Sequence, residues 1–169
     1  AVIPDLNYDS ITLSLEFSAE QWNQVVNPDC GGTSSNIITG GSSNRWLRVW
    51  HSNGDLQLLL NNQGDSKDFT HTYSNIDLSE NQWHRMVLSV DIINKRVITY
   101  LDGRNLGEVF LPADFELITG LENNFRFTDY SIAYTFLGLV DNLMVYDRAF
   151  AASEIYDLYQ ARDLNDTDG

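Results

Sequence analysis

Two tryptophans and an arginine alternate in the stretch NRWLRVWHS, residues 44–52. In an extended strand, successive side chains point to opposite faces, so Trp46, Arg48 and Trp50 would share one face. An indole can stack on the apolar C–H face of a pyranose ring, and a guanidinium can bond hydroxyls, sulfates or uronates. The stretch therefore predicts a sugar-binding strand. The alternative is that the indoles cover the opposite side of the fold or pack under a loop, since Trp is often buried.

Neighbouring strands would widen this face. The hairpin partner of the strand would point Gln57 outward, beside the tryptophans. In the stretch KRVITYLDG, Tyr100 would join the outward side, and His71 and Tyr73 alternate in DFTHTYS and would extend it. The candidate ligand-binding residues are therefore Trp46, Arg48, Trp50, Gln57, His71, Tyr73 and Tyr100.

Other reactive side chains are isolated in the sequence. His51, His71 and His84 form no close pair at the spacing of zinc ligands, and no Gly-x-Ser-x-Gly turn of a serine hydrolase is present. Cys30 is the only cysteine, so no internal disulfide is possible, and no histidine lies near it in the sequence to activate the thiol. These residues predict neither nucleophilic catalysis nor a zinc site.

The elements that would position the candidate residues are mostly strands. Runs with period-two alternation, such as ITLSLEF at residues 11–17, are separated by turn clusters about every ten residues. The Ser-Asn-Gly-Asp core of HSNGD predicts a tight hairpin turn. One segment, AASEIYDLYQARD, indicates a helix in which Ser153 would cap the N-terminus and Ile155, Leu158 and Tyr159 would share a face.

We therefore predict an all-β fold: a two-sheet antiparallel β-sandwich, or jelly roll, with one short C-terminal helix. The 169 residues suit a single domain, which we place at residues 1–163. The polar, acidic residues 164–169 would be a linker or the start of an Asp-rich calcium repeat. The residues predicted to fill the space between the sheets are Leu47, Val49, Leu58, Leu60, Leu88, Val90, Leu101, Leu139 and Leu143.

The charge balance narrows the range of partners. Lys and Arg number 10 against 24 Asp and Glu, which gives a formal net charge of −14 at pH 7. Nucleic acids and anionic membrane surfaces need a basic patch, so we expect neither as a partner. No apolar run approaches the roughly 20 residues of a membrane-spanning helix, and we expect no membrane insertion.

Two stretches resemble one known family. ENQWHRMVLSVDIINKRVITYLDGRNLG, residues 80–107, is similar to the Trp-His…Asp…Tyr-x-Asp-Gly hairpin of LamG-like jelly-roll domains. FLGLVDNLMVYDRAFAASEIYDLY, residues 136–159, resembles their closing strand and short helix. The resemblance implies two sheets packed face to face, one of them curved into a concave outer surface. The predicted sugar-binding strand would lie in that curved sheet, whereas Trp83 and His84 would lie in the core or at a sheet edge.

LamG-like domains resemble other members of the concanavalin A-like superfamily, which includes lectins, adhesion modules, carbohydrate-binding modules and glucanases. The glucanases carry a Glu-x-Asp-x-x-Glu pattern on one strand. Retaining hydrolysis needs two carboxyls held about 5 Å apart, which same-face positions of one strand can supply. No such pattern occurs in this sequence, so we expect no enzymatic activity.

The resemblance also implies a structural Ca²⁺. In related jelly rolls, an Asp that follows the Gly of the last strand joins main-chain carbonyls and an N-terminal acidic residue around the ion. Asp141 matches the first position, and Asp9 is the expected N-terminal partner. The alternative is that Asp141 accepts hydrogen bonds from loop amides, which would offset the cost of burying its charge.

These observations predict a non-catalytic, lectin-like carbohydrate-binding module. It would bind a polysaccharide or other glycan through aromatic residues of the concave sheet. Its remaining partners would be further domains of the same parent chain, a secreted or cell-surface bacterial protein. The alternative is a protein–protein adhesion module or a structural spacer that binds no sugar.

Overall fold

The computed structural model of the chain describes residues 10–22, 34–41, 46–61, 68–116, 125–127 and 136–163. Within these residues, ten strands form two antiparallel sheets of five strands each. The first sheet has the order β10 (Leu137–Tyr146), β1 (Ser10–Gln21), β6 (His84–Asp91), β7 (Arg96–Leu101), β8 (Arg104–Phe110). The second sheet has the order β5 (Phe69–Tyr73), β4 (Asp55–Leu60), β3 (Leu47–Ser52), β2 (Ser34–Gly40), β9 (Phe125–Arg126).

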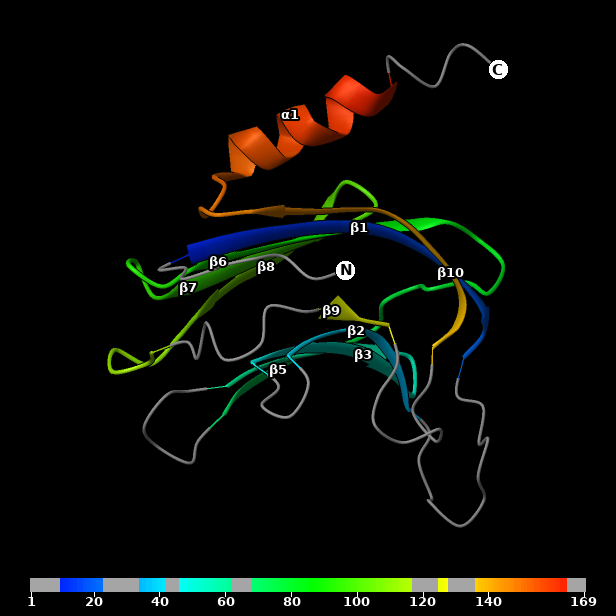
Figure 1. The fold of residues 1–169 in the computed structure, drawn as a ribbon, viewed down its shortest axis with the longest axis horizontal. Coiled ribbons are helices and arrows are strands. Elements are labelled where there is room, and N and C mark those ends of the chain that lie inside the picture. Colours follow the sequence, from blue (N-terminus) through cyan, green and yellow to red (C-terminus); the bar gives the residue numbers. More distant parts are fainter. Residues whose placement is uncertain are drawn as a thin grey trace.

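The two sheets pack face to face, which confirms the predicted β-sandwich (Figure 1). Helix α1 (Ala152–Asp163) lies over the outer side of the first sheet. The strands of both sheets arch in the same direction in this view, so the outer side of the second sheet is the hollow one. The two outer sides of the sandwich are thus different surfaces, one partly covered by a helix and one concave.

The space between the sheets is filled as the period-two pattern predicts. Seven of the nine residues predicted for it are buried: Leu47, Val49, Leu58, Leu60, Leu88, Val90 and Leu101. Leu143 is partly buried and packs against the same cluster. The apolar positions of the β1 run ITLSLEF join them, with Leu13, Leu15 and Phe17 inside the core. Because alternate side chains face the core, the polar positions between them face outward.

Leu139 is the exception, because its side chain is 64% exposed. A regular strand would place Leu139 and Leu143 on the same side. The pairing of β10 with β1 is irregular between these two positions, and Asn142 there has a left-handed φ of 49°. A β-bulge inserts an extra residue and reverses the alternation, so Leu143 faces the core and Leu139 faces outward.

Two turns have the backbone that tight hairpins require. Asn53 and Gly54 connect β3 to β4 with φ values of 52° and 85°. Asp102 and Gly103 connect β7 to β8 with φ values of 50° and 75°. Two successive residues with positive φ match the twist of the flanking strands, and Asn-Gly and Asp-Gly adopt this conformation readily. The hairpin predicted from HSNGD is confirmed.

The connection that leads into α1 is fixed to hydroxyl groups of the first sheet. Thr12 Oγ1 donates to the Arg148 carbonyl at 2.8 Å and accepts the Phe150 N–H at 2.9 Å. Ser89 Oγ donates to the Phe150 carbonyl at 3.0 Å. Thr12 and Ser89 face outward from their strands but are buried, because this connection covers them. Their hydrogen bonds therefore hold the residues just before α1 against the first sheet.

The N-terminus of α1 differs slightly from the prediction. The Ile155 N–H donates to the Ala151 carbonyl at 3.1 Å, so Ala151 is the capping residue and Ser153 lies inside the first turn. Glu154 Oε2 accepts the Ala151 N–H at 2.9 Å, which satisfies a backbone donor that the helix leaves unpaired. The predicted apolar face packs on the first sheet through Ile155, Leu158 and Tyr159.

No helix among the described residues is long and apolar enough to cross a membrane.

Candidate functional site

The outer side of the second sheet carries three of the predicted ligand-binding residues. Arg48 and Trp50 alternate with the buried Leu47 and Val49 on β3, and Gln57 lies directly opposite Trp50 on β4. All three side chains are partly exposed. We call this surface the second-sheet face, which consists of Arg48, Trp50, Gln57, Leu59, Thr70 and Thr72.

Arg48 and Trp50 form one preorganised unit on this face. The Arg48 guanidinium carbon lies 4.6 Å from the centre of the Trp50 ring, a cation–π arrangement. Arg48 Nε also donates to Asn36 Oδ1 on the neighbouring strand β2. These contacts reduce the side-chain freedom that a ligand would otherwise have to restrict on binding. Thr70 and Thr72 place two exposed hydroxyls on the same face, beyond β4.

Trp46 does not share this face, so this part of the prediction is wrong. Its side chain is 5% exposed and its ring packs edge-on against Phe125 at 5.5 Å. Strand β3 begins at Leu47, so the period-two alternation does not extend back to Trp46. A Cβ on Gly40 would lie 2.7 Å from the indole, so the absence of a side chain at Gly40 makes room for the buried ring.

His71 and Tyr73 also point the other way. They pair with Leu58 and Leu56, two residues of the core, and cross-strand partners share a face. Tyr73 is buried, and its hydroxyl is hydrogen-bonded to Thr99 Oγ1 of the first sheet at 2.7 Å. The register of β5 on β4 therefore turns these side chains toward the space between the sheets, and the sequence does not contain that register.

Tyr100 lies on the opposite side of the molecule from Trp50. Its strand β7 belongs to the first sheet, and its ring is buried with Phe150 and Ile155 near α1. The alternation on β7 is as predicted, but the sheet to which β7 belongs is not. Sheet membership depends on long-range strand pairing, which a local pattern cannot specify.

The predicted calcium ligands are only partly described. Asp9 and Cys30 lie outside the described residues. Asp141 is exposed on the outer side of β10, opposite Glu16, and its Oδ1 accepts the Asn142 N–H at 2.7 Å. No group of three His, Cys, Asp or Glu side chains at metal-binding distances occurs among the residues described. These residues alone do not form a calcium site, and the site remains a prediction that depends on Asp9.

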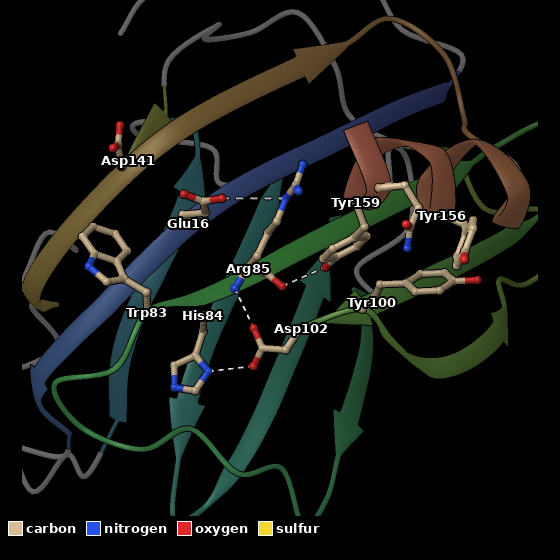
Figure 2. Close-up of a pocket in the computed structure, with 11 residues that line it drawn as sticks. Glu16, Trp83, His84, Arg85, Tyr100, Asp102, Asp141, Tyr156 and Tyr159 are labelled. Atoms are coloured by element: carbon tan, nitrogen blue, oxygen red, sulfur yellow. Dashed lines mark hydrogen bonds and ion pairs between the residues drawn. The ribbon is translucent and has the colours of Figure 1, made fainter. Parts of the chain in front are cut away.

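A second candidate surface is an open cavity of about 740 Å³ between α1 and the outer side of the first sheet (Figure 2). We call it the helix groove. It is lined by Glu16, Trp83, His84, Arg85, Tyr100, Asp102, Gly103, Asp141, Tyr156, Tyr159 and Gln160. Figure 2 shows Trp83 on one side of the groove and Tyr156 on the other, with Arg85 between them.

The groove residues Trp83 and Arg85 were not predicted as site residues. At the start of β6 they form the pattern Trp-x-Arg, with the same spacing as Trp46 and Arg48. This repeated pattern is the feature of the sequence that could have identified them as candidate site residues. His84, between them, is buried as expected, whereas Trp83 is 53% exposed and directly precedes β6, the central strand of the first sheet. Tyr156 was not predicted as a site residue, because the sequence of a helix does not indicate which of its exposed aromatic side chains will line a groove beside a sheet.

His84 joins the groove floor to the turn between β7 and β8. Its Nδ1 lies 2.8 Å from Asp102 Oδ2 and its Nε2 lies 3.2 Å from the Ser79 carbonyl oxygen. Asp102 Oδ1 accepts the Arg85 N–H at 2.8 Å. The hydrogen bond to Asp102 raises the pKa of His84 above its ordinary value of 6.5, although burial acts against it. Both carboxylate oxygens of Asp102 are thus engaged, one with the His84 ring and one with the main-chain N–H of Arg85.

Comparison with known proteins places most of the chain in one family. A family described as the concanavalin A-like lectin/glucanases superfamily matches residues 3–156. No curated protein matches the chain. Among solved structures, the binding domain of Paraclostridial Mosquitocidal Protein 1 is similar, with a TM-score of 0.72 and 15% identity over 90% of this chain and 37% of that chain.

Two further structures show the same fold. The receptor binding domain of botulinum neurotoxin D has a TM-score of 0.70 and 15% identity, over 96% of this chain and 39% of that chain. The Ruminococcus gnavus IT-sialidase CBM40, bound to alpha2,3 sialyllactose, has a TM-score of 0.65 and 17% identity, over 88% and 82%. The chain thus spans little more than a third of the toxin domains. At these identities the similarity concerns the fold.

Proposed function

Because the chain belongs to the concanavalin A-like lectin/glucanase superfamily, we propose that it is a non-catalytic carbohydrate-binding module. The second-sheet face would bind the glycan, with Trp50 as the stacking platform and Arg48 and Gln57 as hydrogen-bonding groups. We further propose that the parent protein is secreted or displayed on a cell surface and carries other domains. The sialyllactose complex of the similar CBM40 supports a glycan as the partner.

One observation carries this proposal: the Arg48 guanidinium stacks on Trp50 on the concave side of the sandwich, 4.6 Å from the ring centre. The arrangement offers one flat apolar surface and directed N–H donors beside it. A pyranose has complementary features, an apolar C–H face and a rim of hydroxyls, and Arg48 would also suit sulfates or uronates. Gln57 adds a donor and an acceptor opposite Trp50, and the hydroxyls of Thr70 and Thr72 add more beyond β4 on the same face.

Catalysis is not part of the proposal because the sequence has no Glu-x-Asp-x-x-Glu pattern. The described outer side of β3 and β4 presents one carboxylate, Asp55 at the hairpin turn, where retaining hydrolysis needs two. A search for released reducing ends tests this point with any polysaccharide that binds. Hydrolysis abolished by substitution of one acidic residue would contradict it.

A glycan array of the intact chain tests the binding function. We expect binding to a restricted set of glycans, weakened at least tenfold by Trp50→Ala, because truncation of an aromatic anchor costs about 2 kcal/mol or more, roughly thirtyfold in affinity. Phe110→Ala is the matched control, since Phe110 is an exposed aromatic (69%) on β8 of the other sheet. If no glycan binds, the adhesion or spacer alternative replaces the proposal.

A further inference from the structure

The geometry of the helix groove points to a second binding site, and we propose that it takes a neutral saccharide. It lies on the outer side of the first sheet and shares no residue with the second-sheet face, so neither site depends on the other. The volume of about 740 Å³ is within the usual range of ligand cavities. Four aromatic residues line it, and Trp83 and Tyr156 are 53% and 61% exposed.

The floor of the groove contains a buried donor, Arg85 Nε, for which the described part of the chain supplies no hydrogen-bond acceptor. The Arg85 side chain is 11% exposed and fixed from two directions. Its guanidinium lies 4.6 Å from the centre of the Tyr159 ring, and its terminal N–H donates to the Leu158 carbonyl at 3.3 Å. Arg85 Nε has no hydrogen-bond partner among the described residues. Buried donors are almost always paired, so an oxygen of a ligand bound in the groove would be a favourable partner for this one.

The position of Glu16 indicates which kind of acceptor fits. Glu16 Oε1 lies 3.9 Å from Arg85 Nε, too far for a direct hydrogen bond. An oxygen that bridges the two atoms, lying beside the line that joins them, would have to accept from Arg85 and donate to Glu16. A hydroxyl can do both, whereas a carboxylate or sulfate has no proton to donate and an ammonium has no lone pair to accept.

The charges around the groove also favour a neutral ligand. Arg85 faces Glu16, and both Asp102 oxygens are bonded to His84 and to a main-chain N–H. The carboxylate of Asp141 lies at the rim. An acidic sugar would meet three carboxylates against one arginine and His84, while a cation would meet a guanidinium at the floor. A water molecule could accept the hydrogen bond of Arg85 Nε, but it would not cover the exposed rings of Trp83 and Tyr156. A saccharide could do both, because it has hydroxyls and an apolar face.

The indole N–H signals of the four tryptophans separate this site from the second-sheet face. We expect a panel of neutral gluco-, manno-, galacto- and xylo-oligosaccharides to include at least one that shifts the Trp83 signal in ¹H–¹⁵N spectra. The buried Trp22 and Trp46 are internal references. Methyl-esterified and free oligogalacturonate supply a pair of matched probes that differ in charge, and the free acid should shift Trp83 less than the ester.

Substitutions at the rim test the same contact without disturbing the core. Trp83→Ala and Tyr156→Ala should each weaken binding of the shifting oligosaccharide at least tenfold, and Phe110→Ala should not. Binding that survives both substitutions would overturn the groove site, as would a panel in which no oligosaccharide moves the Trp83 signal. A larger Trp83 shift with the free acid would overturn the neutral class. Shifts of Trp50 alone would leave the proposed function intact and refute this second site.

Discussion

The ionisation of His84 is linked to the stability of the fold. A neutral imidazole donates from one nitrogen, whereas an imidazolium donates from both and so satisfies Asp102 and the Ser79 carbonyl together. The pKa of His84 is therefore higher in the folded chain than its ordinary 6.5. A group with a raised folded pKa stabilises the fold fully below its unfolded pKa and loses this contribution as the pH rises through the folded pKa.

We expect the urea midpoint of unfolding to fall as the pH rises above 6.5. Asp102→Asn should make this part of the curve flatter, because an amide keeps an acceptor but removes the charge. Asn also tolerates the left-handed backbone at this position, where φ is 50°. Parallel curves for the two proteins between pH 6 and 9 would show that the pair does not contribute.

At the residue scale, the sequence could predict which side chains of β3 point inward. Leu47 and Val49 are buried, and Arg48 and Trp50 are not, because the two-residue period of a strand fixes this alternation. Trp46 could not be predicted in the same way. Its burial depends on where β3 begins and on the space beside Gly40, a residue of another strand.

At the scale of elements, the close approach of β10 to β1 depends on Gly138. A Cβ at this position would lie 2.1 Å from the Ser18 carbonyl oxygen and 2.9 Å from Ala19 Cα, both main-chain atoms that cannot rotate away. Gly138→Ala should therefore destabilise the fold by about 3 kcal/mol, measured by urea unfolding. The strand that carries Asp141 would be displaced with it.

Gly54→Asn is the matched control for this substitution. Gly54 has a φ of 85° but no atom within 4 Å of an added Cβ, and Asn tolerates the left-handed conformation. We expect a loss of about 1 kcal/mol or less. Equal effects of the two substitutions would contradict the steric explanation for Gly138.

Element types were more predictable than their assembly. The strand rhythm, the Asn53–Gly54 hairpin and the apolar face of α1 all follow from local pattern. The sheet to which β7 belongs and the bulge at Asn142 do not, because both depend on pairing between distant segments. Tyr100 and Leu139 were misplaced for these two reasons, and the helix groove went unnoticed because it lies between two elements.

For the whole molecule, the predicted calcium site is testable without knowledge of its ligands. If Asp141 and Asp9 bind Ca²⁺ only in the folded chain, calcium at 100 times its Kd would stabilise by about 2.7 kcal/mol. This corresponds to a rise in Tm of roughly 5–10 °C for a domain of this size. Asp141→Asn should remove the rise. A Tm that is the same in calcium and in a chelator would show that no such site exists.

The measurement that tests the proposed function most directly is a calorimetric titration of the strongest array ligand into the intact chain and into Trp50→Ala. We expect the Kd to increase at least tenfold while the free energy of unfolding of the variant stays within about 1 kcal/mol of that of the parent. Trp50 is partly exposed and lies outside the core cluster, so its truncation should cost the fold little. An unchanged Kd in the folded variant would contradict glycan binding by the second-sheet face.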